Sequence, residues 1–328
     1  MTKKEIIMKK TFKWLFAWAI AMASLTTAAQ SIEFSIHSGY NQSTPTQSSI
    51  ETNITKLLNA LHEAGTEGKV PSLESINMES RAKTRLLALW DNCPFVCEDV
   101  KNIFPCLTDV EGYQVRGIPV TMKPTDDLYT GDKARELVIS FNRNGIITGV
   151  SLALNNVNAE KIMGTGNAVT EMTERRMILK FVEDFRCYYN EKDTAALRAV
   201  YSDDAIIITG SVVHRKQQGD VSCSKEEIRY NKQNKEQYMT SLKRCFKNNK
   251  YINVEFDKID VVKHPTRNGY YGVTLHQKWD SSNYSDDGWL FLLWNFKNPE
   301  EPAIHVRTWQ PQQVEESSVF TIDDFRLD

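Results

Sequence analysis

The residues with the clearest chemical potential are the six cysteines, three of which lie close together at Cys93, Cys97 and Cys106. Their spacing matches neither a paired C-x-x-C zinc site nor a redox motif, and three cysteines cannot all pair among themselves. We therefore predict one local disulfide, with the remaining cysteines as buried thiols. Metal binding is the alternative, and the spacing of the cysteines favours it less than it favours a disulfide with buried thiols.

Other residue types that commonly perform catalysis are scattered along the chain. The six histidines include no pair at the spacing of helical metal ligands, and G-x-S-x-G, H-E-x-x-H and glycine-rich phosphate motifs are missing. Asp203 and Asp204 precede an apolar strand. A structural role, in which their side chains fix the turn before the strand, explains them better than a catalytic role does. The sequence thus predicts no catalytic residue, no metal ligand and no cofactor.

A binding surface is the better prediction, and it lies in the run from Tyr270 to Gln310. This run contains three strand-like segments, YYGVTLHQKW, WLFLLWNF and AIHVRTWQ, bounded by turn signals. We expect Leu275 opposite Leu293 and Phe291 opposite Thr308. Alternation then groups polar and aromatic side chains on the concave face of the sheet, where a side chain of the preceding helix could close a pocket. The predicted ligand-binding residues are Tyr188, Gln277, Trp279, Phe291 and Thr308.

Two interpretations of this concave face stay open. In the first, an apolar wall interrupted by a few hydrogen-bonding groups binds a small apolar ligand. In the second, the same face is a filled core, and the hydroxyl and amide groups of Thr308 and Gln277 are satisfied locally.

The opposite, convex face carries aromatic and apolar side chains that need cover. The predicted interface residues there are Leu292, Trp294, Arg307 and Trp309. We expect the cover to come from a second copy of the chain, from another protein partner or from residues 50–154.

The rest of the chain is divided by changes in pattern. We predict an α+β protein in which a small domain of helices and a three-stranded meander precedes a second domain of three helices and antiparallel strands. The last of these helices is expected at about residues 225–248, followed by a strand with a β-bulge between residues 251 and 263. The predicted divisions are a signal peptide at 1–29, a polar tether at 30–49, the small α+β domain at 50–154, a linker at 155–170, the second domain at 171–313 and a C-terminal tail with an edge strand at 314–328.

Export is predicted from the N-terminus, where five lysines precede the apolar run WLFAWAIAMASL and the small residues Thr27, Ala28 and Ala29 follow it. About 12 apolar residues are too few for a membrane anchor. Cleavage near Ala29 removes five lysines and one glutamate, so the net charge changes from −2 to about −6. A periplasmic or secreted protein that does not bind nucleic acid is expected. Translation could start at Met1 or at Met8.

The second domain resembles the nuclear transport factor 2-like superfamily, which includes polyketide-cyclase-like and ketosteroid-isomerase-like proteins. The resemblance rests on ILKFVEDFRCYYNEKDTAALRAVYSDDAIIITG, followed by a helix and antiparallel strands. It implies a cone-shaped fold, in which a strongly bent antiparallel sheet is wrapped over three helices, with a pocket at one end and a convex face that often pairs two subunits. The two-part layout also resembles uncharacterised exported bacterial proteins.

The resemblance also allows one catalytic residue to be checked. In the isomerases, a catalytic aspartate stands five positions after the second Asp of the Asp-Asp-Ala motif, and here Thr209 occupies that position. A threonine hydroxyl is too weak a base to remove a carbon-bound proton near neutral pH. We therefore favour a non-catalytic binding or interaction protein. The alternative is a lyase, isomerase or hydrolase with an unrecognised acid–base pair, which a pocket carboxylate or histidine with a shifted pKa would indicate.

Overall fold

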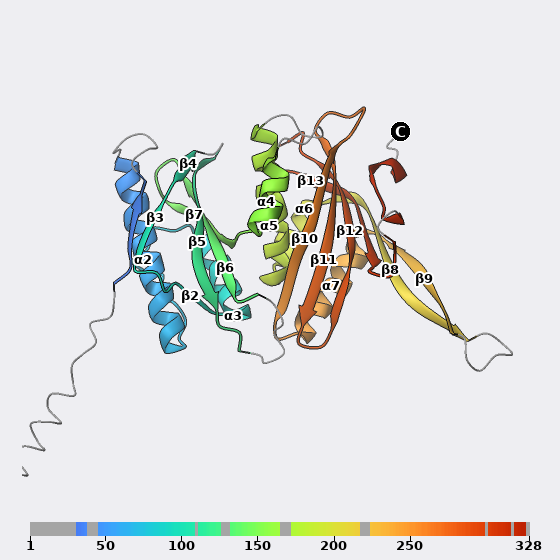
Figure 1. Cartoon of the computed structure of the whole chain (residues 1–328), viewed down its shortest axis with the longest axis horizontal. Coiled ribbons are helices and arrows are strands. Elements are labelled where there is room, and N and C mark those ends of the chain that lie inside the picture. The colour runs from blue at the N-terminus through green and yellow to red at the C-terminus, as the bar shows by residue number, and fades with distance from the viewer. Residues whose placement is uncertain are drawn as a thin grey trace, which may run out of the picture.

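The described part of the chain forms two lobes that lie side by side, each with its own hydrophobic core (Figure 1). The predicted signal peptide lies outside it. No helix within it is long and apolar enough to cross a membrane. The computed structural model describes residues 31–37, 45–108, 111–125, 132–164, 172–216, 224–298, 301–315 and 318–325.

The first lobe packs two helices against one face of an antiparallel sheet. The sheet has the order β2-β5-β6-β7 with β4 added on β5, while β1 and β3 form a separate parallel pair. Helix α2 contacts β2, and α3 contacts β7. The elements are β1 (Glu33–Ile36), α2 (Pro45–Glu67), α3 (Ser80–Asn92), β2 (Phe95–Val96), β3 (Lys101–Phe104), β4 (Cys106–Thr108), β5 (Gly112–Met122), β6 (Ala134–Asn142) and β7 (Ile147–Leu152).

Two features of the first lobe differ from the prediction. Residues 30–49 were expected to be a polar tether, but they contain β1 and the start of α2, and Ile32, Phe34 and Ile36 alternate into the core. The predicted local disulfide is also wrong, because Cys93, Cys97 and Cys106 are free thiols. Burial is the main cause that raises the pKa of each of the three to about 11, which disfavours the reactive thiolate form.

The second lobe wraps a six-stranded sheet, of order β10-β11-β12-β13-β8-β9, around helix α5. All neighbours in the sheet are antiparallel except β13 and β8. The hairpin of β8 and β9 projects from the body of the lobe (Figure 1). The elements are α4 (Asn156–Met163), α5 (Met172–Asn190), α6 (Thr194–Val200), β8 (Tyr201–Lys216), β9 (Ser224–Gln233), α7 (Lys235–Asn248), β10 (Ile252–Lys263), β11 (Tyr270–Ser281), β12 (Ser285–Asn295), β13 (Ala303–Pro311) and the 3₁₀ helix η2 (Ile322–Asp324).

In this lobe, predictions that depend on a few neighbouring residues agree with the structure. The β-bulge expected between residues 251 and 263 is confirmed between Asp257 and Ile259, with Lys258 at a φ of 48°. Longer segments were assigned wrongly. The expected linker at 155–170 contains helix α4, and the first part of the expected helix at 225–248 is strand β9.

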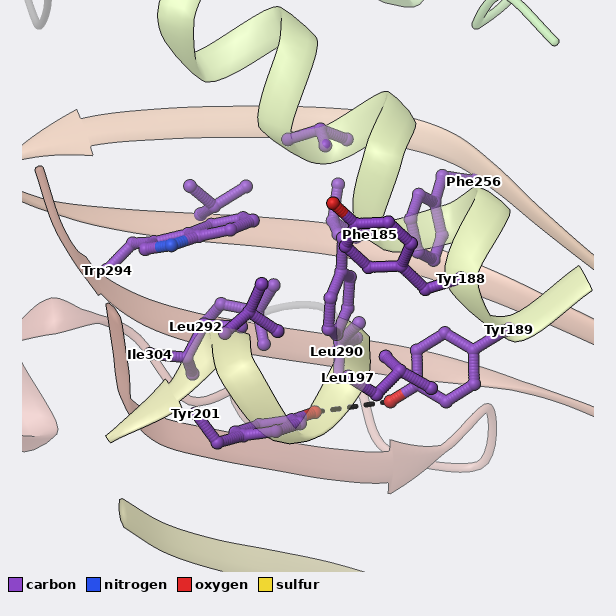
Figure 2. Close-up of a cluster of buried hydrophobic side chains, with 14 of the residues drawn as sticks. Phe185, Tyr188, Tyr189, Leu197, Tyr201, Phe256, Leu290, Leu292, Trp294 and Ile304 are labelled. Carbon is purple, nitrogen blue, oxygen red and sulfur yellow. Dashed lines mark hydrogen bonds between the residues drawn. The ribbon is translucent and has the colours of Figure 1, made fainter. Parts of the chain in front are cut away.

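Strand register decides which face of the sheet each side chain occupies. Phe291 lies opposite Thr308 as predicted, but Leu275 lies opposite Leu290 rather than Leu293. Leu292 and Trp294 therefore point toward α5 and join the core around Phe185 (Figure 2). We call this the inner face; it corresponds to the predicted concave side. The predicted interface residues Leu292, Trp294, Arg307 and Trp309 are buried on this side, so their assignment to the convex face was wrong.

The other side, here called the outer face, is covered by the chain's own C-terminal segment, residues 318–325. Phe325 stacks on Phe291 with ring centroids 5.5 Å apart, and Ile322 packs in the same cluster. Gln310 fixes the segment because its side chain bonds the backbone at Ser318 and Phe320. The tail was predicted to add an edge strand. Instead its described part lies across the sheet and contains η2.

The free edge of β10 is paired by asparagine side chains instead of another strand. Asn92, from the first lobe, accepts from the backbone N–H of Ile252 and donates to its carbonyl, both at 2.8 Å. Asn190 does the same with Val254, and Asn158 donates to the Phe256 carbonyl at 2.9 Å. We call Asn92, Asn190 and Asn158 the asparagine ladder. It satisfies backbone groups that an edge strand would leave open.

Ion pairs join the lobes beside the ladder. Arg116 of β5 forms two hydrogen bonds with Glu183 of α5, at 2.6 and 2.8 Å. Arg85 of α3 bonds Glu191 at 2.8 Å, and Arg135 pairs with Glu255. Because Glu183 is 2% exposed and Glu191 5% exposed, these pairs are largely withdrawn from solvent, and the lobes form a tight interface.

Candidate functional site

A cluster of three tyrosines and one arginine lies on the inner face. The Tyr189 hydroxyl is within hydrogen-bond distance of the hydroxyls of Tyr201 (3.2 Å, drawn in Figure 2) and Tyr238 (2.8 Å). Arg307 reaches the cluster from β13, and its guanidinium lies over the ring of Tyr238, 5.0 Å from the centroid. We call these four residues the tyrosine–arginine cluster.

Arg307 is the least satisfied charge on the inner face. The residue is 6% exposed, and no carboxylate of the described residues lies within ion-pair distance. Its Nε and Nη1 atoms have no hydrogen-bond partner among those residues. Burial lowers the pKa of Arg307, but the neighbouring tyrosines raise this pKa by more than burial lowers it. The pKa therefore lies above its ordinary value, and the guanidinium stays charged. Burying a cation without a counter-ion costs free energy, which an anion bound there would recover.

Asp286 supplies a carboxyl group on the same face. It lies opposite Trp279, at the start of β12, in phase with Leu290 and Leu292. Burial raises the pKa of Asp286 to about 6, although a hydrogen bond with Tyr284 and the charge of Arg307 oppose the shift. A carboxyl group with this pKa can both accept and donate a proton near neutral pH.

Asp286 was not among the predicted site residues, and Arg307 was predicted on the opposite face of the sheet. Both errors follow from the register of β11 on β12, because the observed pairing is shifted from the predicted one by an odd number of residues, from Leu293 to Leu290, which moves every side chain to the opposite face. The alternation of Asp286, Leu290 and Leu292 was visible in the sequence. It could have indicated the site once the face of Leu290 was known.

The structure does not bring the five predicted ligand-binding residues together. Gln277 and Trp279 lie on the inner face, opposite Phe256 and Val254, and Trp279 meets Tyr189 edge-on with centroids 6.0 Å apart. Two other predicted residues, Phe291 and Thr308, lie on the outer face beneath the C-terminal segment. The expectation that both lie on the concave face with Gln277 was therefore wrong.

The fifth predicted residue, Tyr188, belongs to the hydrophobic core of the second lobe (Figure 2) but is not part of the tyrosine–arginine cluster. Its ring sits beneath the Arg85 guanidinium, at 4.9 Å, in a groove between the two lobes. Thr209, at the position of the isomerase base, lies opposite Trp309 in the β8–β13 pairing and so faces inward. Asp203 and Asp204 are exposed; Asp203 pairs with Lys235 at 2.9 Å and Asp204 with His305 at 3.5 Å.

A buried histidine with two carboxylate neighbours lies on the outer face. His276 is 7% exposed and stands between two carboxylates, with Nδ1 2.5 Å from Asp257 and Nε2 2.6 Å from Asp287. Trp289 packs edge-on against the imidazole ring, and Lys258 lies over Trp289. These contacts tie the β10 bulge to β12. Among the described residues, no three His, Cys, Asp or Glu side chains are grouped to hold a metal ion.

Residues 222–304 match the family model described as the Cds6 C-terminal NTF2-like domain. This segment of the second lobe is therefore similar to an NTF2-like domain. Comparison with curated proteins found no match.

Several solved structures resemble parts of the chain. Bd1075 of Bdellovibrio bacteriovorus is 18% identical over 51% of this chain and 46% of its own, with a TM-score of 0.32. The match therefore spans less than half of Bd1075. ActVI-ORFA of Streptomyces coelicolor is 10% identical over 42% of this chain and 98% of its own, with a TM-score of 0.30. An NTF2-like protein of Cytophaga hutchinsonii is 9% identical over 42% and 98%, with a TM-score of 0.28.

Proposed function

We propose that this protein binds a small organic anion on the inner face of its NTF2-like domain and that binding, rather than catalysis, is its function. The observation that carries the proposal is the buried guanidinium of Arg307, which has no carboxylate partner among the described residues. A guanidinium in a poorly hydrated site binds a carboxylate or similar anion through short, charge-assisted hydrogen bonds.

The neighbours of Arg307 support an anion with an aromatic or apolar body. Tyr238 lies under the guanidinium, and Trp279 packs against Tyr189 close by. The Trp309 indole N–H, also on the inner face, has no hydrogen-bond partner among the described residues. Aromatic walls with a few polar groups are typical of small-molecule sites. The purely apolar ligand expected from the sequence is therefore replaced by an amphipathic one.

The proposal can be tested with two matched fluorescent probes. The anion 1-anilinonaphthalene-8-sulfonate and the neutral N-phenyl-1-naphthylamine share an aromatic body but differ in the sulfonate. We expect Arg307→Met to weaken binding of the anionic probe by about tenfold or more while binding of the neutral probe changes little. Arg307→Lys, which keeps the charge, is the control. Equal losses for both probes, or no loss for either, would contradict an anion site at Arg307.

Acid–base catalysis on the bound anion is the second candidate, and the raised pKa of Asp286 favours it. A group that titrates near the working pH is suited to moving a proton to and from carbon. Such chemistry would exchange carbon-bound hydrogen of a β-keto or β-hydroxy acid for deuterium in heavy water. NMR would detect the exchange, and Asp286→Asn should abolish it while keeping the anionic probe bound. If the parent protein shows no exchange, binding remains as the proposed function and catalysis is rejected.

The protein is proposed to act outside the cytoplasm after removal of residues 1–29. The order of lysines, an apolar run and small residues near Ala29 supports this placement. We expect mass spectrometry of the native protein to give a chain that starts at or near Gln30. A mature chain that retains Trp14–Leu25 would contradict processing.

A further inference from the structure

Three polar side chains share the inner face of the second lobe: Asp286 of β12, and Arg307 and Trp309 of β13. Arg307 lies opposite Leu292, and Trp309 lies opposite Leu290. Asp286 is in phase with Leu290 and Leu292 along β12, because side chains alternate between the two faces of a strand. The carboxyl, guanidinium and indole groups therefore lie on the same side of the sheet.

Gly288 brings the indole ring of Trp309 close to Asp286. A Cβ atom added to Gly288 would lie 2.9 and 3.0 Å from the Cζ2 and Cε2 atoms of Trp309, so the glycine leaves room for the ring to lie against β12. Cε2 is bonded to the indole nitrogen. Gly288 is the next residue on the same face after Asp286, about 7 Å along the strand. The indole nitrogen of Trp309 therefore lies near the Asp286 side chain.

Each of the three side chains has a buried polar atom without a partner. Oδ1 of Asp286, Nε1 of Trp309, and Nε and Nη1 of Arg307 are withdrawn from solvent and have no hydrogen-bond partner among the described residues. Most buried polar groups in folded proteins are paired, and an unpaired one costs free energy. Three such side chains on one face indicate a ligand that pairs with all of them.

Asp286 and Arg307 carry opposite charges on this face. Burial raises the pKa of Asp286 to about 6, so its carboxyl group is mostly ionised at pH 7.5. The charge of Arg307 opposes this rise, so the two groups lie within electrostatic reach of each other. Their unpartnered atoms nevertheless form no hydrogen bond between them. A simple anion at Arg307 would therefore leave Asp286 unpaired and would be repelled by it.

We propose that the ligand of the inner face is an amino acid, whose carboxylate binds Arg307 and the indole N–H of Trp309 and whose ammonium group binds Asp286. A carboxylate accepts hydrogen bonds from a guanidinium and an indole, and an ammonium group donates to a carboxylate. The zwitterion also adds no net charge to a buried site that already holds one cation and one anion.

The aromatic neighbours of the site favour an amino acid with an aromatic or apolar side chain. Tyr189 and Trp279 meet edge-on on the same face, with ring centroids 6.0 Å apart. Aromatic walls of this kind are typical of small-molecule sites. This ligand class rests on the proposed function, because it needs the anion site at Arg307.

Three ligands with the same skeleton test the ammonium group in the parent protein. Phenylalanine carries the ammonium group, 3-phenyllactate has a hydroxyl in its place, and 3-phenylpropionate has only hydrogen there. Calorimetry at pH 7.5 would measure binding of 3-phenylpropionate and of both enantiomers of the other two. We expect one enantiomer of phenylalanine to bind about tenfold more tightly than either of the other acids, because only an ammonium group forms a doubly charged hydrogen bond with the Asp286 carboxylate.

Substitutions at the two charged residues should separate the two ends of the ligand. Asp286→Asn should weaken binding of phenylalanine by about tenfold and strengthen binding of 3-phenylpropionate, because it removes the ammonium partner of one and the repulsion of the other. Arg307→Met should weaken both by about tenfold or more. Asp280→Asn is the matched control and should change neither affinity, because Asp280 lies opposite Ser285 and out of phase with Trp279.

Near-UV circular dichroism would verify that each variant is folded. The amino acid would be overturned as the ligand if phenylalanine binds the parent protein no more tightly than the other two acids, or if Asp286→Asn leaves its affinity unchanged. The anion site would still stand in that case if 3-phenylpropionate binds and is weakened by Arg307→Met. An Arg307→Met variant that binds 3-phenylpropionate as tightly as the parent does would contradict the anion site, and the amino-acid ligand with it.

Discussion

At the scale of single residues, the pKa of Asp286 makes a prediction about stability. Burial raises this pKa from 3.8 to about 6, so the folded chain binds the proton more tightly than the unfolded chain. The carboxyl group therefore lowers the free energy of unfolding least at acidic pH. This loss of stability grows as the pH rises toward about 6. Asp286→Asn carries no charge at any pH. From pH 5 to pH 8, we expect the variant to gain about 1 kcal/mol of unfolding free energy relative to the parent.

Urea unfolding of both chains at the two pH values measures this gain. Asp280→Asn is a useful control, since Asp280 lies on the neighbouring strand opposite Ser285. A gain that does not depend on pH would mean that Asp286 is hydrated in the folded protein.

Residue-level prediction from the sequence was accurate where the cause is local. Aspartate is a favoured residue at a helix N-cap, and the carboxylate of Asp193, just before α6, accepts from the N–H groups of Ala195 and Ala196 at 3.0 and 2.8 Å. Arg307 and Asp286 could not be recognised in the same way. Their burial and their lack of partners depend on strands that meet only in the folded sheet.

At the scale of elements, the C-terminal segment should be needed to keep the outer face covered. Deletion of residues 314–328 would uncover Phe291, Leu293 and Val306, which are at most 3% exposed in the intact chain. Exposed aromatic patches of this kind associate. We expect the truncated protein to sediment as a dimer or larger species, and Phe325→Ala to show a weaker form of the same shift.

The truncated chain is the decisive sample in that experiment. A fully monomeric truncated protein of unchanged stability would show that the segment does not protect the face. The Asp323→Asn variant, which keeps every aromatic contact, should sediment as the parent does.

The wrongly assigned elements share one cause. Residues 224–233 are rich in charged side chains and read as helical, but they form β9 because β8 provides a partner along its length. The tail shows the reverse error. Its alternation at Phe320 and Ile322 indicates a strand, yet the described part packs side chains onto the face of a sheet without pairing at an edge.

At the scale of the whole molecule, the buried ion pairs should make the two lobes depend on each other. Arg116→Ala leaves Glu183, which is 2% exposed, without its cation. We expect a loss of roughly 3 kcal/mol in unfolding free energy, because an uncompensated buried charge is costly. The double change Arg116→Leu with Glu183→Gln should cost less than the single one.

Urea unfolding followed by both fluorescence and circular dichroism would measure these losses. Lys123→Ala, which removes a pair with Glu98 that is about half exposed on both sides, should change stability by no more than about 1 kcal/mol. An equal loss for the single and double changes would indicate that Glu183 is hydrated or protonated once Arg116 is gone.

The two-lobe division and the α+β class followed from the order of helical and strand patterns in the sequence, and the resemblance to NTF2-like proteins was drawn from the segment around Asp193. The way in which the two lobes join could not be predicted from the sequence. The partners that join them, such as Asn92 and Ile252 or Arg116 and Glu183, are far apart in the chain and carry no periodic signal.

The asparagine ladder makes the stability of the folded chain sensitive to deamidation. Asparagine side chains slowly hydrolyse to aspartate, and an aspartate carboxylate accepts hydrogen bonds but cannot donate them. At Asn190, this conversion would keep the bond from the Val254 N–H and lose the bond to the Val254 carbonyl, leaving a new negative charge in a buried site. The shelf life of the folded chain is therefore tied to three amide groups along one strand edge.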